Sequence, residues 1–399
     1  MTTATYDHDG EERLVTGHSG RLSLLLSLGW LATLLGREAL PPLLPDIIAA
    51  LNITSSQAGV ALTLMWGLYA LMQYPSGRLA DGLSRTTVLV VSLVILILGF
   101  VLLSVVGSYV AFLFAVALIG IGAGLYFVPT RALLSDLFVE RRAQAFGIQM
   151  AAGGLGSALA AGVAVAAITV ATWQTAFLPA IVGLIVVFAF LHRWSHEPYV
   201  IDRVSLDLRG TGSRVFATTE LRWVVIAYSL FAVTWSGVIG FLPTFLRAEK
   251  ALSPALASSA FALIFIVAII IGPISGNLGD RFDHTSVAAA ALTLGLIGLA
   301  AVIYAPSLPV ILLGVVVFAA GLRSYPPVMQ AYLMDAFPDD SMGGDFGAIK
   351  AIYTGVGSLG PSYIGFVAQE ATYVVAFSGL VVALLAAVGI ILWLMYSRG

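Results

Sequence analysis

The stretch GRLADGLSR at residues 77–85 returns later in the chain as GNLGDRFDH at residues 276–284. Both copies keep a glycine, a leucine and an aspartate at matching positions, and both follow a long apolar run. A second landmark follows each copy, because DLF at residues 136–138 returns as DAF at residues 335–337. Landmarks that repeat at half the length of a 399-residue chain indicate that its two halves arose by duplication.

The composition places the chain in a membrane. Hydrophobic residues make up 59% of it and charged residues 10%, whereas soluble domains average roughly 45–50% and 25%. Apolar segments of about 20 residues recur, which is long enough to cross a hydrocarbon core about 30 Å thick. Backbone groups in lipid must be hydrogen-bonded internally, so these segments are expected to be helices. We therefore expect an all-α membrane protein with twelve transmembrane helices, at residues 22–45, 56–76, 86–106, 109–134, 143–169, 173–191, 222–245, 253–275, 286–305, 308–333, 345–367 and 371–396.

The basic residues predict the orientation. A charged stretch at residues 192–221 is expected to be a cytoplasmic linker between an N-terminal bundle (1–191) and a C-terminal bundle (222–399). With twelve spans, the side that holds both termini would carry most of the arginines, and the other side only Arg247 and Lys250. Basic residues near short loops stay in the cytoplasm. We expect a multi-pass protein of the cytoplasmic membrane with both termini inside, and no signal peptide, because the first 20 residues are polar.

Twelve helices in two six-helix halves, with this loop pattern after the second and eighth helices, resemble the major facilitator superfamily. The family signature reads G-x-L-a-D-r-x-G-r, and Ser84 stands where its second glycine is usual. The resemblance implies two pseudo-symmetric six-helix bundles that rock around a central cavity. In transporters built from repeats, the working site lies at the repeat interface. The resemblance to the superfamily also implies a conformational latch made of Gly77, Asp81, Arg85, Asp136, Gly276, Asp280, Arg281, His284 and Asp335.

In the family's arrangement, Asp81 faces the start of the eleventh helix, where unpaired N–H groups favour a carboxylate, and Arg85 reaches Asp136. The second half differs, because His284 takes the place of Arg85. Histidine gains its charge only in mild acid, so we expect acid to tighten a contact between His284 and Asp335. The alternative is that all these charges are interfacial anchors.

Charges at membrane depth are the best pointers to the cargo, since they are costly and usually face a cavity or a partner. Arg37 and Glu38 lie within the first expected helix, and Arg323 lies within the tenth. Arg37 is eight residues before Pro45, and the second helix carries WGLYALMQYPSG at 66–77. Both features resemble the organic-anion branch of the superfamily. In its glycerol-3-phosphate transporter, the first-helix Arg binds phosphate together with a mate in helix 7.

The corresponding helix-7 position of this chain is Trp235, eight residues before Pro243. The pair that clamps a dianion is therefore absent, which argues against phosphate esters. Glu38 is a candidate coupling residue, because desolvation favours its protonated form while a nearby Arg favours its ionised form. In an alternative interpretation, Arg37 or Arg323 pairs with Glu38 and only ties helices together. The candidate substrate-binding residues are Arg37, Arg323, Tyr126, Trp235 and Gln73, with weaker candidates Trp66, Tyr69, Gln149, Tyr228, Tyr325 and Tyr353.

These features predict a secondary active transporter that moves a small organic anion by alternating access. The alternative is a proton-coupled multidrug-type exporter, favoured by an acidic helix-1 residue in an apolar cavity. A membrane receptor or intramembrane enzyme is disfavoured, because the expected spans show no nucleophile–base pair or metal-ligand cluster, and the chain has no Cys. We expect no catalytic residue, metal or cofactor. The expected partners are a small-molecule substrate, a coupling proton or other ion and the lipid bilayer, with no nucleic acid, and the protein is expected to be a monomer.

Overall fold

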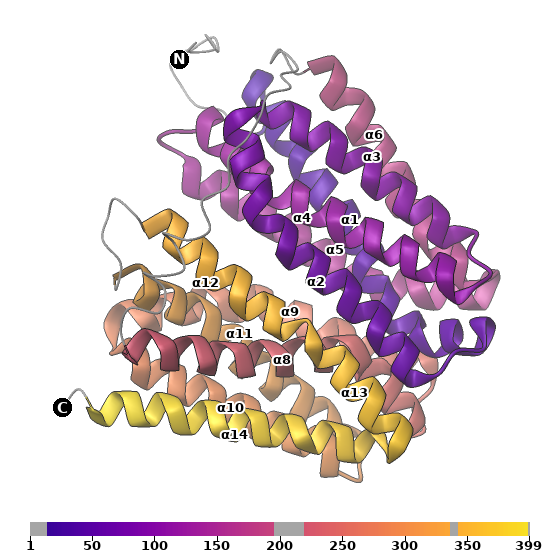
Figure 1. Cartoon of the computed structure of the whole chain (residues 1–399), viewed down its shortest axis with the longest axis vertical. Helices are drawn as coiled ribbons and strands as arrows, with labels where there is room; N and C mark the ends of the chain where they lie inside the picture. The colour runs from indigo at the N-terminus through magenta and orange to yellow at the C-terminus, as the bar shows by residue number, and fades with distance from the viewer. Residues whose placement is uncertain (1–13, 195–218, 336–341, 398–399) are drawn as a thin grey trace. The chain divides into compact units, whose positions relative to one another are not determined.

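A computed structural model of the chain describes residues 14–194, 219–335 and 342–397. Within these ranges every regular element is a helix (Figure 1). The helices of the first half are α1 (Gly17–Leu51), α2 (Ser55–Gly82), α3 (Arg85–Ser104), α4 (Tyr109–Leu137), α5 (Arg142–Val170), the short 3₁₀ helix η1 (Trp173–Phe177) and α6 (Leu178–Trp194). Those of the second half are α8 (Thr219–Ala248), α9 (Pro254–Arg281), α10 (His284–Tyr304), α11 (Leu308–Asp335), α12 (Met342–Gly357), α13 (Leu359–Glu370) and α14 (Tyr373–Ser397).

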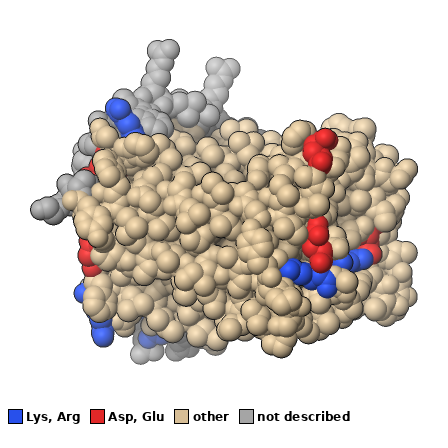
Figure 2. Space-filling model, turned by 90° about the horizontal axis from the view of Figure 1, so that it is seen from below, with Lys and Arg blue, Asp and Glu red and all other residues tan. Residues whose placement is uncertain are grey.

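Ten of the described helical segments are long and apolar enough to cross a membrane. Two expected spans fall outside this group for local reasons. One is α2, which carries Gln73, Arg78 and Asp81 near its end, and the other is divided into the shorter helices α12 and α13. On the face shown in Figure 2, the charged side chains lie toward the two ends, and a broad belt between them carries none. This is the surface expected of a multi-pass membrane protein.

The contacts within the chain divide it into two compact units, which do not coincide with the two halves of the sequence. Unit 1 contains residues 1–39 and 71–206, and unit 2 contains residues 40–70 and 207–399. The C-terminal part of α1 and the N-terminal part of α2 thus belong to the same unit as α8 to α14. The domain boundaries expected from the sequence stay a prediction.

Unit 1 is built around α3, which packs on α4, η1 and α6. Its core is aromatic and aliphatic, with Phe100 and Phe112 fully buried. The helix α5 approaches α1 closely at Gly153, where an added Cβ would lie 2.5 Å from the indole nitrogen of Trp30. Small residues at such crossings let membrane helices approach one another, and this crossing fixes the face of α1 that carries Trp30.

In unit 2, α10 and α11 pack extensively on each other, and glycines line the crossing. A Cβ added at Gly298 would lie 2.6 Å from Cα of Phe318 and 2.8 Å from the carbonyl oxygen of Gly314. A Cβ at Gly321 would lie 2.6 Å from the carbonyl oxygen of Ala291. The two backbones therefore touch. Lipid tails are as apolar as leucine, so packing of this kind, rather than hydrophobic burial, holds membrane helices together.

The prediction of a single helix at residues 345–367 is wrong in detail. The structure has two helices there, α12 and α13, which are separated at Ser358. Pro361 lies two residues into α13 and has no N–H to donate to the carbonyl of Gly357. The hydroxyl of Ser236 on α8 donates to that carbonyl instead, and the Ser358 hydroxyl donates to the carbonyl of Gly355 (2.6 Å). The Gly357 carbonyl therefore remains hydrogen-bonded although the helix is interrupted.

We expect Gly298→Ala to destabilise unit 2, since the new methyl group forces α10 and α11 apart. Overpacking costs about 1–3 kcal/mol, which the better helix propensity of alanine offsets only in part. The measurement is the thermal unfolding midpoint of the purified protein. Gly272→Ala on α9 is the control, because nothing lies within 4 Å of its added Cβ. Equal midpoints for the two variants would contradict the close packing of α10 on α11.

Candidate functional site

Arg37 and Glu38 form a buried ion pair on α1. The Glu38 Oε1 atom accepts hydrogen bonds from Nε (3.1 Å) and Nη2 (2.9 Å) of Arg37. Both residues are almost fully buried, with 6% and 4% of their surface exposed. The two charges therefore neutralise each other within one helix, and this contact does not tie α1 to another helix.

The local sequence explains why the helix can hold this pair. Pro41 and Pro42 lie within α1, one turn after the pair. Because proline has no N–H, neither can donate the usual helical hydrogen bond to the carbonyl of the residue four positions earlier, here Arg37 and Glu38. The charged residues thus sit where the helical hydrogen-bond ladder is interrupted, a place suited to a site that changes partners.

In unit 2, Arg323 of α11 lies over aromatic rings. Its Cζ atom is 4.2 Å from the ring centroid of Trp235 on α8 and 5.5 Å from that of Phe265 on α9. The ring of Trp235 in turn stacks on Phe318, with centroids 6.4 Å apart and planes 7° from parallel. Arg323 and Trp235 are both partly exposed. A guanidinium that lies on a ring face is stabilised by the ring quadrupole, and the contact does not use its N–H groups, which lie in the plane of the guanidinium.

Tyr126 of α4 has a packing role in the structure. It is fully buried, its hydroxyl donates to the carbonyl of Leu26 on α1 (2.8 Å), and its ring stacks on Trp30 with centroids 6.4 Å apart. Gln73 of α2 is 8% exposed, and its amide nitrogen has no hydrogen-bond partner among the described residues. A buried donor without an acceptor costs about 1–3 kcal/mol, so of these two candidates Gln73 has the capacity to gain a bond from a ligand.

Gln149 and a group of three tyrosines were only weaker substrate-binding candidates in the sequence, but the structure gives both a distinct environment. Gln149 of α5 is fully buried, and neither its amide oxygen nor its amide nitrogen has a partner in the described part of the chain. In unit 2, the ring of Tyr228 stacks on that of Tyr353 with centroids 3.9 Å apart and lies 5.1 Å from that of Tyr325. The Tyr325 hydroxyl is buried without a partner among these residues. An amide in an otherwise apolar helix was the available signal for Gln149, whereas the tyrosines come from α8, α11 and α12, whose adjacency no local pattern reveals.

A polar network joins the C-terminal end of α1 to unit 2 helices from the second half of the sequence. Asp46 of α1 pairs with Arg247 of α8 through Nη1–Oδ2 (2.7 Å) and Nη2–Oδ1 (3.4 Å). The contact is bidentate, with two guanidinium nitrogens against two carboxylate oxygens. Both side chains are partly exposed. A second contact runs from Thr63 of α2 to Ser362 of α13, whose hydroxyl and backbone N–H lie 2.7 and 3.1 Å from the Thr63 oxygen.

Within the expected latch, the structure contains the ion pair between Arg85 and Asp136. Ser84, which departs from the family pattern, begins α3 as its N-cap and accepts a hydrogen bond from the Thr87 N–H (3.2 Å). Asp283 caps α10 in the same way at the matching position of the second copy. An N-cap that satisfies an unpaired N–H explains a serine or aspartate here.

Four of the remaining latch residues can be placed on helices. Arg281 ends α9 and is exposed, and His284 begins α10 and is partly exposed. Gly77 lies in α2 and Gly276 in α9. The latch role of the whole set stays a prediction. The side chains of Asp81, Asp280 and Asp335 lie outside the described part of the structure.

Residues 26–247, and again residues 224–398, match the family model of the Major Facilitator Superfamily. The chain belongs to this superfamily. The two overlapping matches fit the internal repeat, and the expected all-α membrane fold is confirmed.

Solved structures share the fold of this superfamily member. One is a bacterial homologue of the human lysosomal transporter Spinster in an inward-facing and occupied conformation, with a TM-score of 0.82 over 96% of this chain and 97% of that one, at 17% identity. Another is a variant of the nucleoside transporter NupG, with a TM-score of 0.77 over 94% and 99% of the two chains, at 15% identity. At these identities the likeness concerns the fold alone.

Among curated proteins, a probable 4-methylmuconolactone transporter of Cupriavidus pinatubonensis (strain JMP 134 / LMG 1197) is 26% identical over 248 residues. The matched region covers 59% of this chain and 58% of that relative. The chain thus spans less than two thirds of the length of the relative.

We expect Glu38→Gln to destabilise the protein more than the double change Arg37→Gln with Glu38→Gln. The single change leaves a buried guanidinium without its carboxylate, which typically costs about 3–5 kcal/mol, whereas removal of both charges is often nearly neutral. Thermal unfolding of both purified variants without added solute measures the difference. If the double variant unfolds at or below the midpoint of the single variant, the ion pair does not neutralise the site as described.

Proposed function

We propose that this superfamily member is a secondary transporter that carries a small organic monoanion, a carboxylate, by alternating access. The observation that carries the proposal is the partly exposed guanidinium of Arg323 on the face of Trp235. Carboxylates accept two parallel hydrogen bonds from a guanidinium edge, and a ring on one face of the guanidinium holds that edge in a fixed direction.

The charges of the candidate residues favour a monoanion over a dianion. Arg37 is balanced by Glu38 within their ion pair, whereas Arg323 brings one positive charge to the ring face of Trp235. A phosphate ester or dicarboxylate would leave one negative charge uncompensated in a low-dielectric site, which is costly. The relative named for 4-methylmuconolactone agrees with this choice, because a muconolactone carries one carboxylate beside an uncharged lactone ring.

The pairing of Arg37 with Glu38 also supplies a coupling step. We assign the coupling proton to Glu38, because it is the buried carboxylate of this ion pair. The same pair weakens the case for a multidrug-type exporter, because the acidic helix-1 residue that favoured it is paired with Arg37.

Alternating access requires contacts that break and reform at each membrane face. The contacts of Asp46 with Arg247 and of Thr63 with Ser362 join sequence-distant helices at one end of unit 2. The excess of arginine on the side of the termini favours a cytoplasmic position for both ends of the chain. The Asp46–Arg247 pair then lies at the outer face of the cytoplasmic membrane and acts as an outer latch.

We expect Arg323→Gln to weaken the binding of monocarboxylates, because a hydrogen bond to a charged group contributes about 1.5–3 kcal/mol. That range corresponds to a rise in Kd of about 10- to 150-fold. Arg131→Gln is the matched control, since Arg131 also lies over aromatic rings, those of Phe127 (4.7 Å) and Phe146 (5.3 Å). Arg323→Lys should fall between them, because it keeps the charge and loses the planar fork.

The measurement is a binding titration on purified protein with 4-methylmuconolactone, a simple aliphatic monocarboxylate, a dicarboxylate, a nucleoside and a lipophilic phosphonium cation. Tight binding of the phosphonium cation with no response to monocarboxylates would replace the proposal by the multidrug-type exporter. Equal effects of Arg323→Gln and Arg131→Gln would remove Arg323 from the binding site.

The outer latch has its own test. Asp46→Asn or Arg247→Gln should raise the labelling rate of a cysteine placed at Leu62, which is buried and packs near Gly240 of α8. A partly exposed ion pair contributes about 0.2–1 kcal/mol, so the expected increase is about 1.4- to five-fold. The natural chain has no cysteine, which leaves this label unambiguous. The charge-reversed pair Asp46→Arg with Arg247→Asp should return the rate toward the starting value, and a rate that stays high would contradict the latch.

A further inference from the structure

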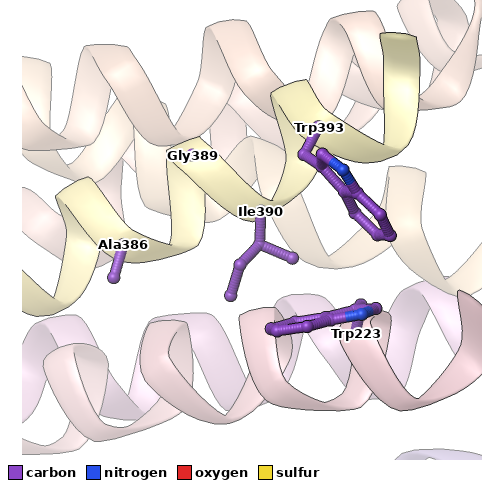
Figure 3. A pocket seen from close by; sticks show the side chains of 5 residues that line it. All are labelled: Trp223, Ala386, Gly389, Ile390 and Trp393. Atoms are coloured by element: carbon purple, nitrogen blue, oxygen red, sulfur yellow. The ribbon is translucent and has the colours of Figure 1, made fainter. Parts of the chain in front are cut away.

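A groove of about 340 Å³ lies between α8 and α14, away from the residues assigned to cargo. Its walls are Trp223 near the start of α8 and Ala386, Gly389, Ile390 and Trp393 on α14. Figure 3 shows the two indoles converging at one end of the groove, while Ile390 and Ala386 continue along α14 away from them. The indole centroids are 5.7 Å apart, with the rings 62° from parallel.

The groove is open to the surroundings of the membrane-spanning helices. Trp223 is 38% exposed and Trp393 is 50% exposed, and both lie on helices long and apolar enough to span a bilayer. At Gly389 nothing lies within 4 Å of an added Cβ, so the floor of the groove has room there. A linear apolar cleft at this depth fits an acyl chain.

Two exposed polar side chains lie close to the two tryptophans along their helices. Arg222 is adjacent to Trp223 and exposed, and Tyr396, one turn after Trp393, is 77% exposed. Tryptophan and tyrosine are enriched at the level of the lipid headgroups, and arginines at the cytoplasmic surface attract anionic lipids. The groove therefore runs from the headgroup level toward the apolar belt.

We propose that this groove binds one acyl chain of an anionic phospholipid, with the phosphate at Arg222 and Tyr396. An acyl chain gains little free energy when it leaves other lipid tails for the groove, since the tails are equally apolar. Selection must then come from the headgroup charge and from the shape between the two indoles. Trp223 and Trp235 are twelve residues apart on α8, about 18 Å along the helix axis, so this site is distinct from the cargo residues and does not depend on the proposed cargo.

The test is quenching of tryptophan fluorescence in the full chain, reconstituted with phosphatidylcholine or phosphatidylglycerol that carries brominated acyl chains. We expect brominated phosphatidylglycerol to quench at an about five-fold lower mole fraction than brominated phosphatidylcholine, since one arginine near a membrane surface contributes about that factor. Arg222→Gln should remove the difference between the two lipids. Gly389→Leu, which fills the groove, should abolish the preferential quenching.

The control variant is Gly162→Leu on α5, at another exposed glycine with nothing within 4 Å of an added Cβ. Its tryptophan fluorescence should be quenched by each lipid as in the natural protein. Equal quenching by the two lipids in the natural protein would overturn the proposal and indicate ordinary annular lipid. Unchanged selectivity in both Gly389→Leu and Arg222→Gln would overturn it as well. A change of oligomeric state in Gly389→Leu would instead assign this face to contact between copies of the chain.

Discussion

A charge inside a membrane-spanning bundle must be neutralised or placed against a polarisable group, and the structure meets this constraint differently at each cation. Arg37 is neutralised by its neighbour Glu38. Arg323 lies on the face of Trp235, and Arg247 near a helix end shares the fork of its guanidinium with Asp46. The ion pairs supply no net charge, whereas a guanidinium on a ring keeps its charge and its donors.

The same constraint applies to the backbone, because an unpaired carbonyl in lipid costs several kcal/mol. Prolines at 41 and 42 of α1 and at 361 of α13 remove helical donors, so their carbonyl partners need other groups. At the α12–α13 break the substitute is the Ser236 hydroxyl of α8. Such a break is tolerated only where a neighbouring helix supplies a donor, which ties its position to the packing of α8 on α12 and α13.

These two constraints separate what the sequence could predict from what it could not. Apolar runs of span length and the duplicated loop pattern depend on local composition, so the helices and the superfamily could be recognised. The Arg85–Asp136 pair also followed from the family's arrangement. The break at Ser358, the aromatic partner of Arg323 and the cluster of Tyr228, Tyr325 and Tyr353 depend on which helices are neighbours. A single apolar helix carries no record of the face that its neighbour covers, so these features appear only in the folded chain.

Duplication followed by divergence explains why the candidate site is asymmetric. Arg37 and Trp235 occupy equivalent positions in the two halves, each eight residues before a proline, and Tyr126 is the counterpart of Arg323. In the second half the two equivalent positions contact each other as a cation on a ring. In the first half the tyrosine stacks on Trp30 and donates to Leu26, and the arginine pairs with Glu38. A symmetric pair of free arginines would suit a dianion. Cation and aromatic residue have thus exchanged places between the halves, and the cation of the first half is neutralised by a carboxylate.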